Sequence, residues 1–296
     1  MKVDFHCHST ASDGTFAPRE LAAAACGGGF GAIALTDHDN TDGAVEFLGA
    51  GEPGGCRLLA GVELSIEPGE GFDRFHLLGI GIDPLAPALR SLLAKVLEGR
   101  KERNAKIIEN FRRLGFDMAE TIGGYSNGEV LARPHFARWL VDRGHVASVK
   151  EGFARYLASD SPPETRCYER RWRPAQEEAF AAIHASGGIC VMAHPKYWRD
   201  EWKLAGPDYA MAARELSRLK EAGLDALEAK YQANEPSEDV EFTRLADSLG
   251  LLKSAGSDFH GGNKPAITLG MDVSDSFIAP LFARLGLAPV SRPGRS

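Results

Sequence analysis

The sequence alternates between short apolar segments and longer segments in which apolar residues recur every three or four positions. Each apolar segment has the length and composition of a buried strand. We predict strands at 3–7, 32–35, 58–62, 75–82, 189–193, 226–229 and 251–255, and helices at 18–27, 43–50, 174–186, 208–222 and 236–249. Pro18 and Pro174 are placed as first-turn prolines. This alternation indicates an α/β fold with a parallel sheet, open or closed into a barrel.

Residues 83–173 break the alternation, because this stretch is too long for one crossover and its pattern is mostly helical, over 89–114 and 127–143. We interpret it as a helical insertion over the barrel mouth; the alternative is a set of extra helices packed on the barrel wall. The catalytic barrel would then consist of 1–82 and 174–286. Residues 287–296, rich in Pro, Ser and Arg, are predicted to form a flexible tail.

The composition of the chain limits its expected binding partners and its expected cellular compartment. The formal net charge of −7 disfavours a broad nucleic-acid surface, so no stable nucleic-acid complex is expected. The five scattered cysteines include no C-x-x-C pair, which suits reduced thiols. No apolar run approaches the ~20 residues that span a bilayer, and the N-terminus does not resemble a signal peptide. We expect a soluble, cytoplasmic protein without membrane contact.

The first polar motif is His6-Cys7-His8. Residues two apart on a strand face the same side, so the two imidazoles project together while Cys7 turns into the packing. A single histidine near a strand end is more often structural than a metal ligand. Two of them, followed by Asp13 in a Ser-Asp-Gly turn, favour a metal site.

Asp37-His38-Asp39 comes directly after the predicted strand 32–35. Three consecutive ionisable groups at the end of a buried strand are costly without partners. A metal on His38, with the flanking carboxylates orienting the ligands, removes that cost. The alternative is a helix N-cap cluster, which suits Asp39 alone better than the three residues together.

Other predicted strands also carry polar residues near their ends. Glu63 follows 58–62, His76 lies within 75–82, and His194 follows 189–193 in Ala-His-Pro; taken singly, Glu63 or His76 can be an ordinary buried polar residue. Asp258 and His260 have i, i+2 spacing after 251–255. The carboxyl ends of parallel strands meet at one edge, where such folds keep their chemistry.

Six of the nine histidines belong to these motifs. With three carboxylates they give nine candidate ligands: His6, His8, Asp13, His38, Glu63, His76, His194, Asp258 and His260. Because a mononuclear zinc site uses three or four protein ligands, nine indicate two or three divalent ions that share a bridging carboxylate. Nitrogen and oxygen donors without thiolate suit Mn, Fe or Zn, and we favour Mn.

In this order the motifs resemble the PHP family, named for polymerase and histidinol phosphatase. The resemblance covers residues 2 to about 273 and implies a distorted (β/α)7 TIM-like barrel with a trinuclear centre. By the family pattern, His6, His8, Glu63 and Asp258 hold one metal, Glu63 bridges to a second bound by His76 and His194, and Asp13, His38 and His260 hold the third.

Arg133-Pro134-His135 within the insertion resembles the stand-alone phosphoesterase branch, which includes enzymes similar to nucleoside 3′,5′-bisphosphate phosphatases and 5′-3′ exoribonucleases. The resemblance implies that Arg133 and His135 hold substrate phosphate; alternatively, Arg133-Pro134 is simply a helix start. Lys196 stands where the family commonly has glycine, and either contacts phosphate or faces solvent. Asn104 is a weaker substrate-binding candidate on the same insertion.

The predicted function is hydrolysis of nucleotide phosphate monoesters, above all the 3′-phosphate of nucleoside 3′,5′-bisphosphates, with short 5′-phosphorylated RNA as a further substrate. A hydroxide bridging two metals would attack phosphorus. Asp13, His194 and Asp258 are the predicted catalytic residues, and a metal-bound water, Asp13 or His194 are the candidate proton donors. The alternatives are a histidinol-phosphate phosphatase, an amidohydrolase-type enzyme and a non-catalytic metal-binding regulatory module.

Overall fold

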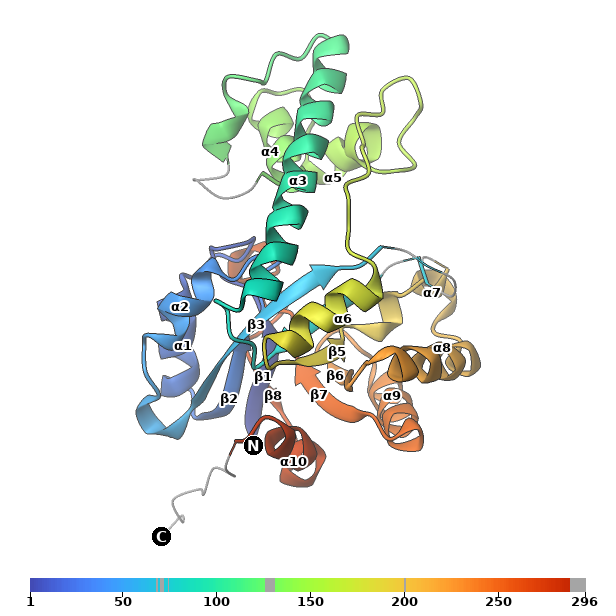
Figure 1. Cartoon of the computed structure of the whole chain (residues 1–296). Coiled ribbons are helices and arrows are strands. Elements are labelled where there is room, and N and C mark those ends of the chain that lie inside the picture. The colour runs from blue at the N-terminus through green and yellow to red at the C-terminus, as the bar shows by residue number, and fades with distance from the viewer. Residues whose placement is uncertain (68, 70–71, 74, 126–130, 200, 288–296) are drawn as a thin grey trace. The chain divides into compact units, whose positions relative to one another are not determined.

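In the computed structural model, the seven predicted strands and one further strand assemble into one eight-stranded sheet in the order β7-β6-β5-β4-β3-β2-β1-β8. A parallel bridge from Cys7 in β1 to Phe259, just past β7, brings distant strands of this order together, so the sheet is a nearly closed barrel (Figure 1). The strands are β1 (Lys2–Cys7), β2 (Phe30–Leu35), β3 (Arg57–Ser65), β4 (His76–Ile80), β5 (Ile189–Met192), β6 (Ala226–Tyr231), β7 (Leu252–Gly256) and β8 (Met271–Asp272).

The structure describes residues 1–67, 69, 72–73, 75–125, 131–199 and 201–287. They form two units, Met1–Leu93 with Pro174–Ser296 and Ala94–Arg173. The barrel belongs to the first unit. Within these described residues, no helix has both the length and the apolar character that crossing a membrane requires. The predicted tail lies almost wholly outside the described residues, since they end at 287.

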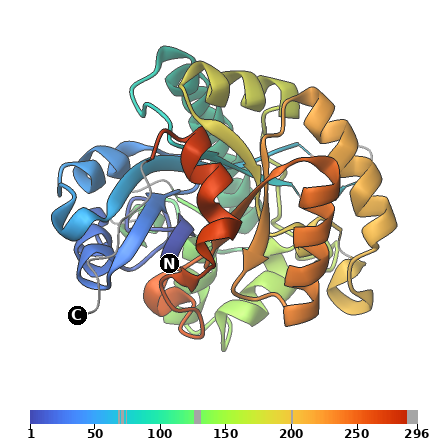
Figure 2. The same cartoon turned by 90° about the horizontal axis from the view of Figure 1, so that it is seen from below.

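Helices cover the outside of the barrel. They are α1 (Pro18–Gly27), α2 (Asp42–Leu48), α6 (Gln176–Ala185), α7 (Trp202–Ala205), α8 (Tyr209–Ala222), α9 (Pro236–Leu249) and α10 (Asp275–Arg284), with short 3₁₀ segments at Pro53–Gly55, Pro195–Tyr197 and Gly261–Asn263. In Figure 1, α1 and α2 lie on one side of the strands and α6, α8 and α9 on the other, and Figure 2 shows α10 across the front. Phe5 of β1 packs edge-on against Phe282 of α10, with ring centroids 6.3 Å apart.

The predicted helices and the seven predicted strands of the barrel are confirmed, with three corrections. The sequence prediction missed β8 and α10. Pro174 is not in the first turn of a helix, because α6 begins at Gln176. The Pro174 carbonyl instead accepts a hydrogen bond from the Glu67 amide at 3.0 Å, which ties the approach to α6 to the segment after β3.

The third correction concerns strand direction. β4 runs antiparallel to both β3 and β5, and β8 runs antiparallel to β1, so the sheet is mixed rather than parallel. Residues 66–75 between β3 and β4 are too few for the crossover that a parallel neighbour needs. His76 is therefore the first residue of β4, opposite Ser65 at the end of β3. The reversal places His76 at the barrel end where the parallel strands finish.

The second unit is helical and has its own core. α3 (Pro87–Arg113) contributes the part of its length from residue 94 onward, followed by a 3₁₀ turn (Ile122–Tyr125), α4 (Arg133–Asp142), α5 (Val149–Gly152) and a π-helical turn (Phe153–Leu157). Phe111, Phe136 and Trp139 are buried in its centre. The helix predicted over 89–114 is confirmed as α3. The start of the helix predicted over 127–143 falls partly outside the described residues, and α4 begins at Arg133.

Candidate metal centre

Glu63 lies at the centre of the site. Backbone pairing continues past β2 and β3, since the Glu63 amide donates to the Asp37 carbonyl at 3.1 Å and the Asp39 amide donates to the Glu63 carbonyl at 2.9 Å. This pairing sets His38 beside Glu63, with Nδ1 2.9 Å from Oε2. Oε2 also lies 3.2 Å from Nε2 of both His6 and His8, which project from the end of β1. One carboxylate oxygen thus faces three imidazoles.

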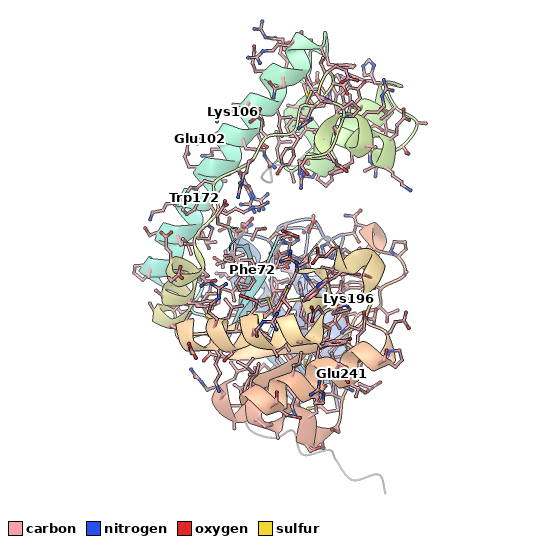
Figure 3. The ribbon with its side chains drawn as sticks, turned by 90° about the vertical axis from the view of Figure 1, so that its right-hand side faces the viewer. Phe72, Glu102, Lys106, Trp172, Lys196 and Glu241 are labelled. Atoms are coloured by element: carbon pink, nitrogen blue, oxygen red, sulfur yellow. The ribbon has the colours of Figure 1, made fainter. Side chains whose placement is uncertain are left out.

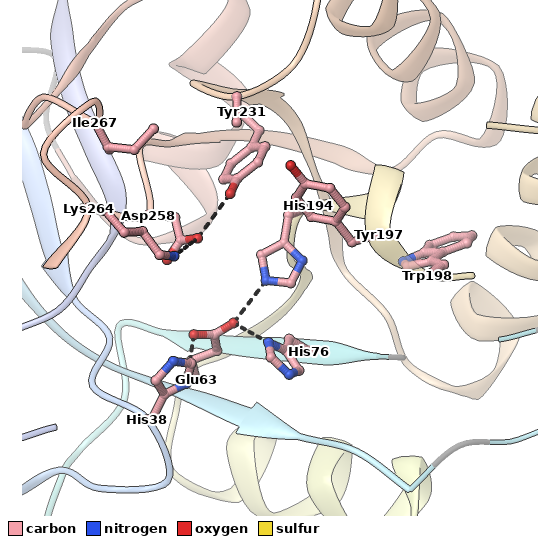
Figure 4. Close-up of a pocket in the computed structure, with 11 residues that line it drawn as sticks. His38, Glu63, His76, His194, Tyr197, Trp198, Tyr231, Asp258, Lys264 and Ile267 are labelled. Carbon is pink, nitrogen blue, oxygen red and sulfur yellow. Dashed lines mark hydrogen bonds and ion pairs between the residues drawn. The ribbon is translucent and has the colours of Figure 1, made fainter. Parts of the chain in front are cut away.

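The other oxygen of Glu63 faces two further imidazoles. Oε1 lies 2.8 Å from His76 Nδ1 and 3.1 Å from His194 Nε2 (Figure 4). Glu63 therefore offers each of its oxygens to a different group of histidines. That is the arrangement of a carboxylate that can bridge two cations.

Asp13, His38 and His260 gather on the far side of His8. Asp13 Oδ1 lies 3.2 Å from His260 Nε2 and 3.9 Å from His38 Nε2. The His8 and His260 rings have centroids 4.1 Å apart. One donor atom from each of these four residues lies within 4.8 Å of the others, which is compact enough to surround a single ion.

Asp258 closes the site from the segment after β7. Its Oδ1 lies 3.6 Å from His6 Nε2 and 3.4 Å from His8 Nε2. Its Oδ2 accepts hydrogen bonds from the Tyr231 hydroxyl at 3.0 Å and from Lys264 Nζ at 2.6 Å (Figure 4). The structure thus brings all nine predicted ligands to one end of the barrel.

The donors fit a cluster of cations. Among the described residues, Glu63 Oε2, His6 Nε2 and both ring nitrogens of His8 are buried polar atoms without a hydrogen-bond partner. His6 and His8 are fully buried, and Glu63 is 1 % exposed. Unpartnered buried polar atoms are destabilising unless something coordinates them. Nitrogen and oxygen donors at these separations suit divalent ions such as Mn, Fe or Zn.

The electrostatics of the cluster point the same way. Burial raises the pKa of Glu63, but the neighbouring imidazoles of His38 and His6 outweigh it and hold that pKa well below its usual range. Burial lowers the pKa of His8, but the nearby carboxylates of Asp258 and Glu63 outweigh it and raise that pKa to about 9. The pocket thus favours ionised carboxylates surrounded by positive charge, which bound cations would supply directly.

Glu228 is a site residue that the sequence analysis missed. It is fully buried in β6. Its Oε1 accepts from His6 Nδ1 at 3.0 Å, and its Oε2 accepts from the His194 amide at 2.6 Å. A carboxylate behind a metal-binding imidazole fixes the ring orientation. The available signal was an acidic residue inside the predicted apolar strand 226–229.

Two further carboxylates organise the loops around the ligands. Asp37 accepts from the Ser9 amide and hydroxyl, both at 2.7 Å, and from the Ser12 hydroxyl at 2.6 Å. Asp4 accepts from the Ser257 amide at 3.0 Å and from the Gly270 amide at 2.8 Å. Burial raises the pKa of Asp4 to about 6 against the effect of these hydrogen bonds. Both carboxylates orient backbone that carries ligands.

The backbone at the site departs from ordinary strand geometry. Asp39, His194 and Asp258 have φ values of 52°, 27° and 59°. Few non-glycine residues adopt this left-handed region, and those that do concentrate at functional sites. Each of these three residues lies just past a strand end, where the chain turns away from the sheet.

A pocket of about 480 Å³ opens above the cluster. His38, Glu63, His76, His194 and Asp258 form its polar part, and Tyr197, Trp198, Tyr231, Ala233, Lys264 and Ile267 form the remaining wall. Figure 4 shows the aromatic side chains on the His194 side of the pocket. A polar floor beside a largely aromatic wall suits a ligand that combines a charged group with a ring.

Lys196 does not line this pocket. Its Nζ donates to the Ala233 carbonyl at 2.7 Å and to Oε2 of Glu238, on α9, at 2.6 Å. Figure 3 labels Lys196 together with Glu241 of α9. Lys196 thus neither contacts the pocket nor faces open solvent, and its two acceptors favour a structural role. The lysine that lines the pocket is Lys264.

The three other predicted substrate-binding residues lie in the second unit. Nη1 of Arg133 donates to the Leu157 carbonyl at 3.2 Å, and its guanidinium lies 5.3 Å from the centre of the Tyr168 ring. His135 Nδ1 accepts from the Ala132 amide at 2.9 Å, which caps α4. Asn104 Nδ2 donates to the Leu131 carbonyl at 2.8 Å. Within this unit, all three residues stabilise the start of α4.

Comparison with known proteins agrees with the geometry. Residues 4–222 match the family model described as the PHP domain. The 3′,5′-nucleoside bisphosphate phosphatase of Chromobacterium violaceum is 34 % identical over 266 residues, 87 % of each chain. The 5′-3′ exoribonuclease of Haemophilus influenzae is 32 % identical over 265 residues, 88 % of this chain and 90 % of its own.

Two solved structures superpose on nearly the whole chain. One is an amidohydrolase from Chromobacterium violaceum with bound sulfate and no metal, with a TM-score of 0.77, 31 % identity and coverage of 96 % of this chain and 97 % of its own. The other is a metal-dependent phosphoesterase from Bifidobacterium adolescentis, with a TM-score of 0.75, 27 % identity and coverage of 97 % of both chains.

Proposed function

Because this chain belongs to the PHP family and is a metal-dependent phosphoesterase, we propose that it removes the 3′-phosphate from nucleoside 3′,5′-bisphosphates. Short 5′-phosphorylated RNA is the proposed second substrate. The relatives named as bisphosphate phosphatase and exoribonuclease match this chain over about the same residues and to a similar degree. Both activities act on a nucleotide phosphate.

One observation carries the proposal: the two oxygens of Glu63 face separate groups of imidazoles on the floor of a pocket with an aromatic wall. The floor suits a phosphate held by clustered cations. The wall, with Tyr197 and Tyr231 at a ring-centroid separation of 6.0 Å, suits a nucleobase.

The ions would be held by the nine ligands described above, with Mn as the proposed metal. When bound, they supply positive charge that activates water and neutralises phosphate oxygens. Glu63 and Asp258 balance that charge from the barrel side. His194 is the proposed proton donor to the leaving oxygen of the ester. Burial raises the pKa of Asp13, but the imidazoles of His38 and His260 outweigh it and hold that pKa well below its usual range, so Asp13 is proposed to act in the ionised form.

Arg133, His135 and Asn104 of the helical insertion are proposed to bind the substrate phosphate. Arginine is the side chain best suited to bidentate phosphate recognition. Its ring contact with Tyr168 at 5.3 Å leaves the planar guanidinium oriented before substrate arrives.

A phosphate-release screen with added Mn tests the proposal. The substrates are a nucleoside 3′,5′-bisphosphate, histidinol phosphate and a short 5′-phosphorylated RNA, each with intact protein, chelated protein and the Asp258→Ala variant. We expect release from the bisphosphate, and loss of release on chelation and in the variant without unfolding. Release from histidinol phosphate alone would replace the proposed substrate. No release from any ester would favour a regulatory metal-binding role.

A further inference from the structure

Lys264 occupies a position in the pocket wall that its sequence context does not reveal. It follows the Gly-Ser-Asp-Phe-His motif by four residues, and its amide donates to the Gly261 carbonyl at 3.1 Å. This tight turn brings the side chain back toward Asp258, where Nζ contacts Oδ2 at 2.6 Å. The ammonium is therefore held beside the cluster by the carboxylate that closes it.

Asp258 presents different surroundings to its two oxygens. Oδ1 faces the buried imidazoles of His6 and His8, while Oδ2 is held by Tyr231 and Lys264. A metal would bind on the Oδ1 side, where the other ligands gather. Lys264 therefore adds a positive charge on the opposite side of this carboxylate, next to the cluster rather than within it.

The ammonium of Lys264 retains hydrogen-bonding capacity. A lysine has three N–H donors, and among the described residues Asp258 is the one acceptor in contact with Nζ. Its side chain is 41 % exposed and lines the pocket. Lys196 provides the contrast, because its Nζ already has two protein acceptors, Ala233 and Glu238.

We propose that Lys264 is a substrate-binding residue whose ammonium contacts an oxygen of the substrate phosphate, while Asp258 and Tyr231 hold it in position. This inference rests on the proposed function, since it requires a phosphate in the pocket. Lysine binds phosphate as a compact point charge, and its attraction adds to that of the metals without displacing a metal ligand. Because the side chain is partly exposed, we expect its contribution to the free energy of phosphate binding to lie at the lower end of the range for charge-assisted hydrogen bonds.

The test measures binding of inorganic phosphate to the Mn-loaded full chain by titration calorimetry. Lys264→Met is compared with Lys264→Arg, which keeps the charge, and with Lys253→Met. Lys253 lies at the start of β7 and pairs with Asp247, so its variant loses the same charge at the other end of that strand. We expect phosphate binding to weaken about tenfold in Lys264→Met and to remain within about threefold of the unmodified protein in the other two.

Bound Mn is measured in the same samples by elemental analysis. We expect an unchanged Mn content in Lys264→Met. Unchanged phosphate binding would overturn the inference. Parallel loss of Mn and phosphate would also overturn it, because Lys264 would then support the metal ligand Asp258 rather than the substrate. If Lys264→Met does not fold, Lys264→Arg provides the test. Because Lys264→Arg keeps the positive charge, phosphate binding as weak as that of the metal-free protein would count against the inference.

The binding assay is independent of turnover. If phosphate binding depends on Lys264 while the nucleotide esters are not hydrolysed, the inference stands and the proposed function fails. If the esters are hydrolysed and phosphate binding ignores Lys264, the proposed function stands and the inference fails.

Discussion

Glu228 holds His6 from behind: its Oε1 accepts from His6 Nδ1 at 3.0 Å, and both side chains are fully buried. This contact fixes the tautomer that leaves Nε2 of His6 to face Glu63. Glu228 also accepts from the His194 amide at 2.6 Å. One carboxylate therefore orients one ligand in β1 and another just after β5.

The Glu228→Gln variant should bind Mn more weakly, by about tenfold or more, because a neutral amide makes His6 a poorer ligand. Titration calorimetry with Mn measures the change, and thermal unfolding of the metal-free protein serves as the control for folding. An unchanged Mn affinity would show that the contact between Glu228 and His6 contributes to packing and not to metal binding.

Gly256 leaves room for this pair. A Cβ at Gly256 would lie 2.3 Å from Glu228 Oε1 and 2.4 Å from His6 Cβ. We expect Gly256→Ala to lower the free energy of unfolding by about 1–3 kcal/mol through overpacking and to reduce Mn affinity together with it. Denaturant unfolding and Mn titration on the same samples give both quantities. Gly27→Ala is the control, because its Cβ would meet nothing within 4 Å.

Mn should stabilise the folded chain, since the ligand cluster forms only on folding. At a free Mn concentration about a hundred times the dissociation constant, the gain is about 2.7 kcal/mol. Thermal unfolding with Mn and with a chelator measures this shift. Glu63→Gln should abolish most of it by removing the central charge.

Glu241→Gln is the matched control for Glu63→Gln. Glu241 pairs with Arg244 at 2.7 Å on the surface of α9 (Figure 3) and should leave the Mn-induced shift intact. Equal shifts in the Glu63→Gln variant and the intact protein would contradict a central role for Glu63.

Arg133→Ala tests the proposed role of the insertion. We expect KM for the bisphosphate to rise by about tenfold, the scale of a charge-assisted hydrogen bond, with a smaller change in kcat. Arg138, exposed on the same helix, provides the control variant Arg138→Ala. A lower thermal midpoint with an unchanged KM would show that Arg133 serves only the start of α4, where it donates to the Leu157 carbonyl.

The thiols should react slowly in the native protein. Four of the five cysteines are buried, and Cys26 is partly exposed. Burial raises the pKa of Cys56 and of Cys167 to about 12, so both are protonated and unreactive at pH 8. Titration with a chromogenic disulfide at pH 8 should label Cys26 first, and rapid reaction of all five thiols would contradict the structure.

The convergence of the nine candidate ligands could be predicted from the sequence, because most of them stand near a strand end, where position in the chain implies position in space. His6 and His8 show this directly, since strand geometry alone places both rings on one face. Glu63 lies near the end of β3 and Asp258 follows β7, and both strands finish at the same edge. Asp13 instead lies in the loop after β1. Periodicity therefore carried most of the information about the site.

The rest depends on contacts that periodicity does not encode. His76 joins the cluster because β4 is reversed, and the length of the preceding connection was the available sign. Lys196 follows a ligand motif closely, yet its turn directs Nζ to Glu238, whereas the turn after His260 directs Lys264 into the pocket. The direction of a side chain that leaves a turn depends on backbone angles that residue spacing does not fix.

The left-handed backbone at Asp39, His194 and Asp258 has a consequence for how this chain can be improved. Glycine adopts such angles without the local cost of about 1–3 kcal/mol that other residues bear. Selection for heat resistance alone would therefore favour glycine at these positions and would erase the chemistry. The sequence of highest folding stability is therefore expected to differ from the functional sequence at these three positions.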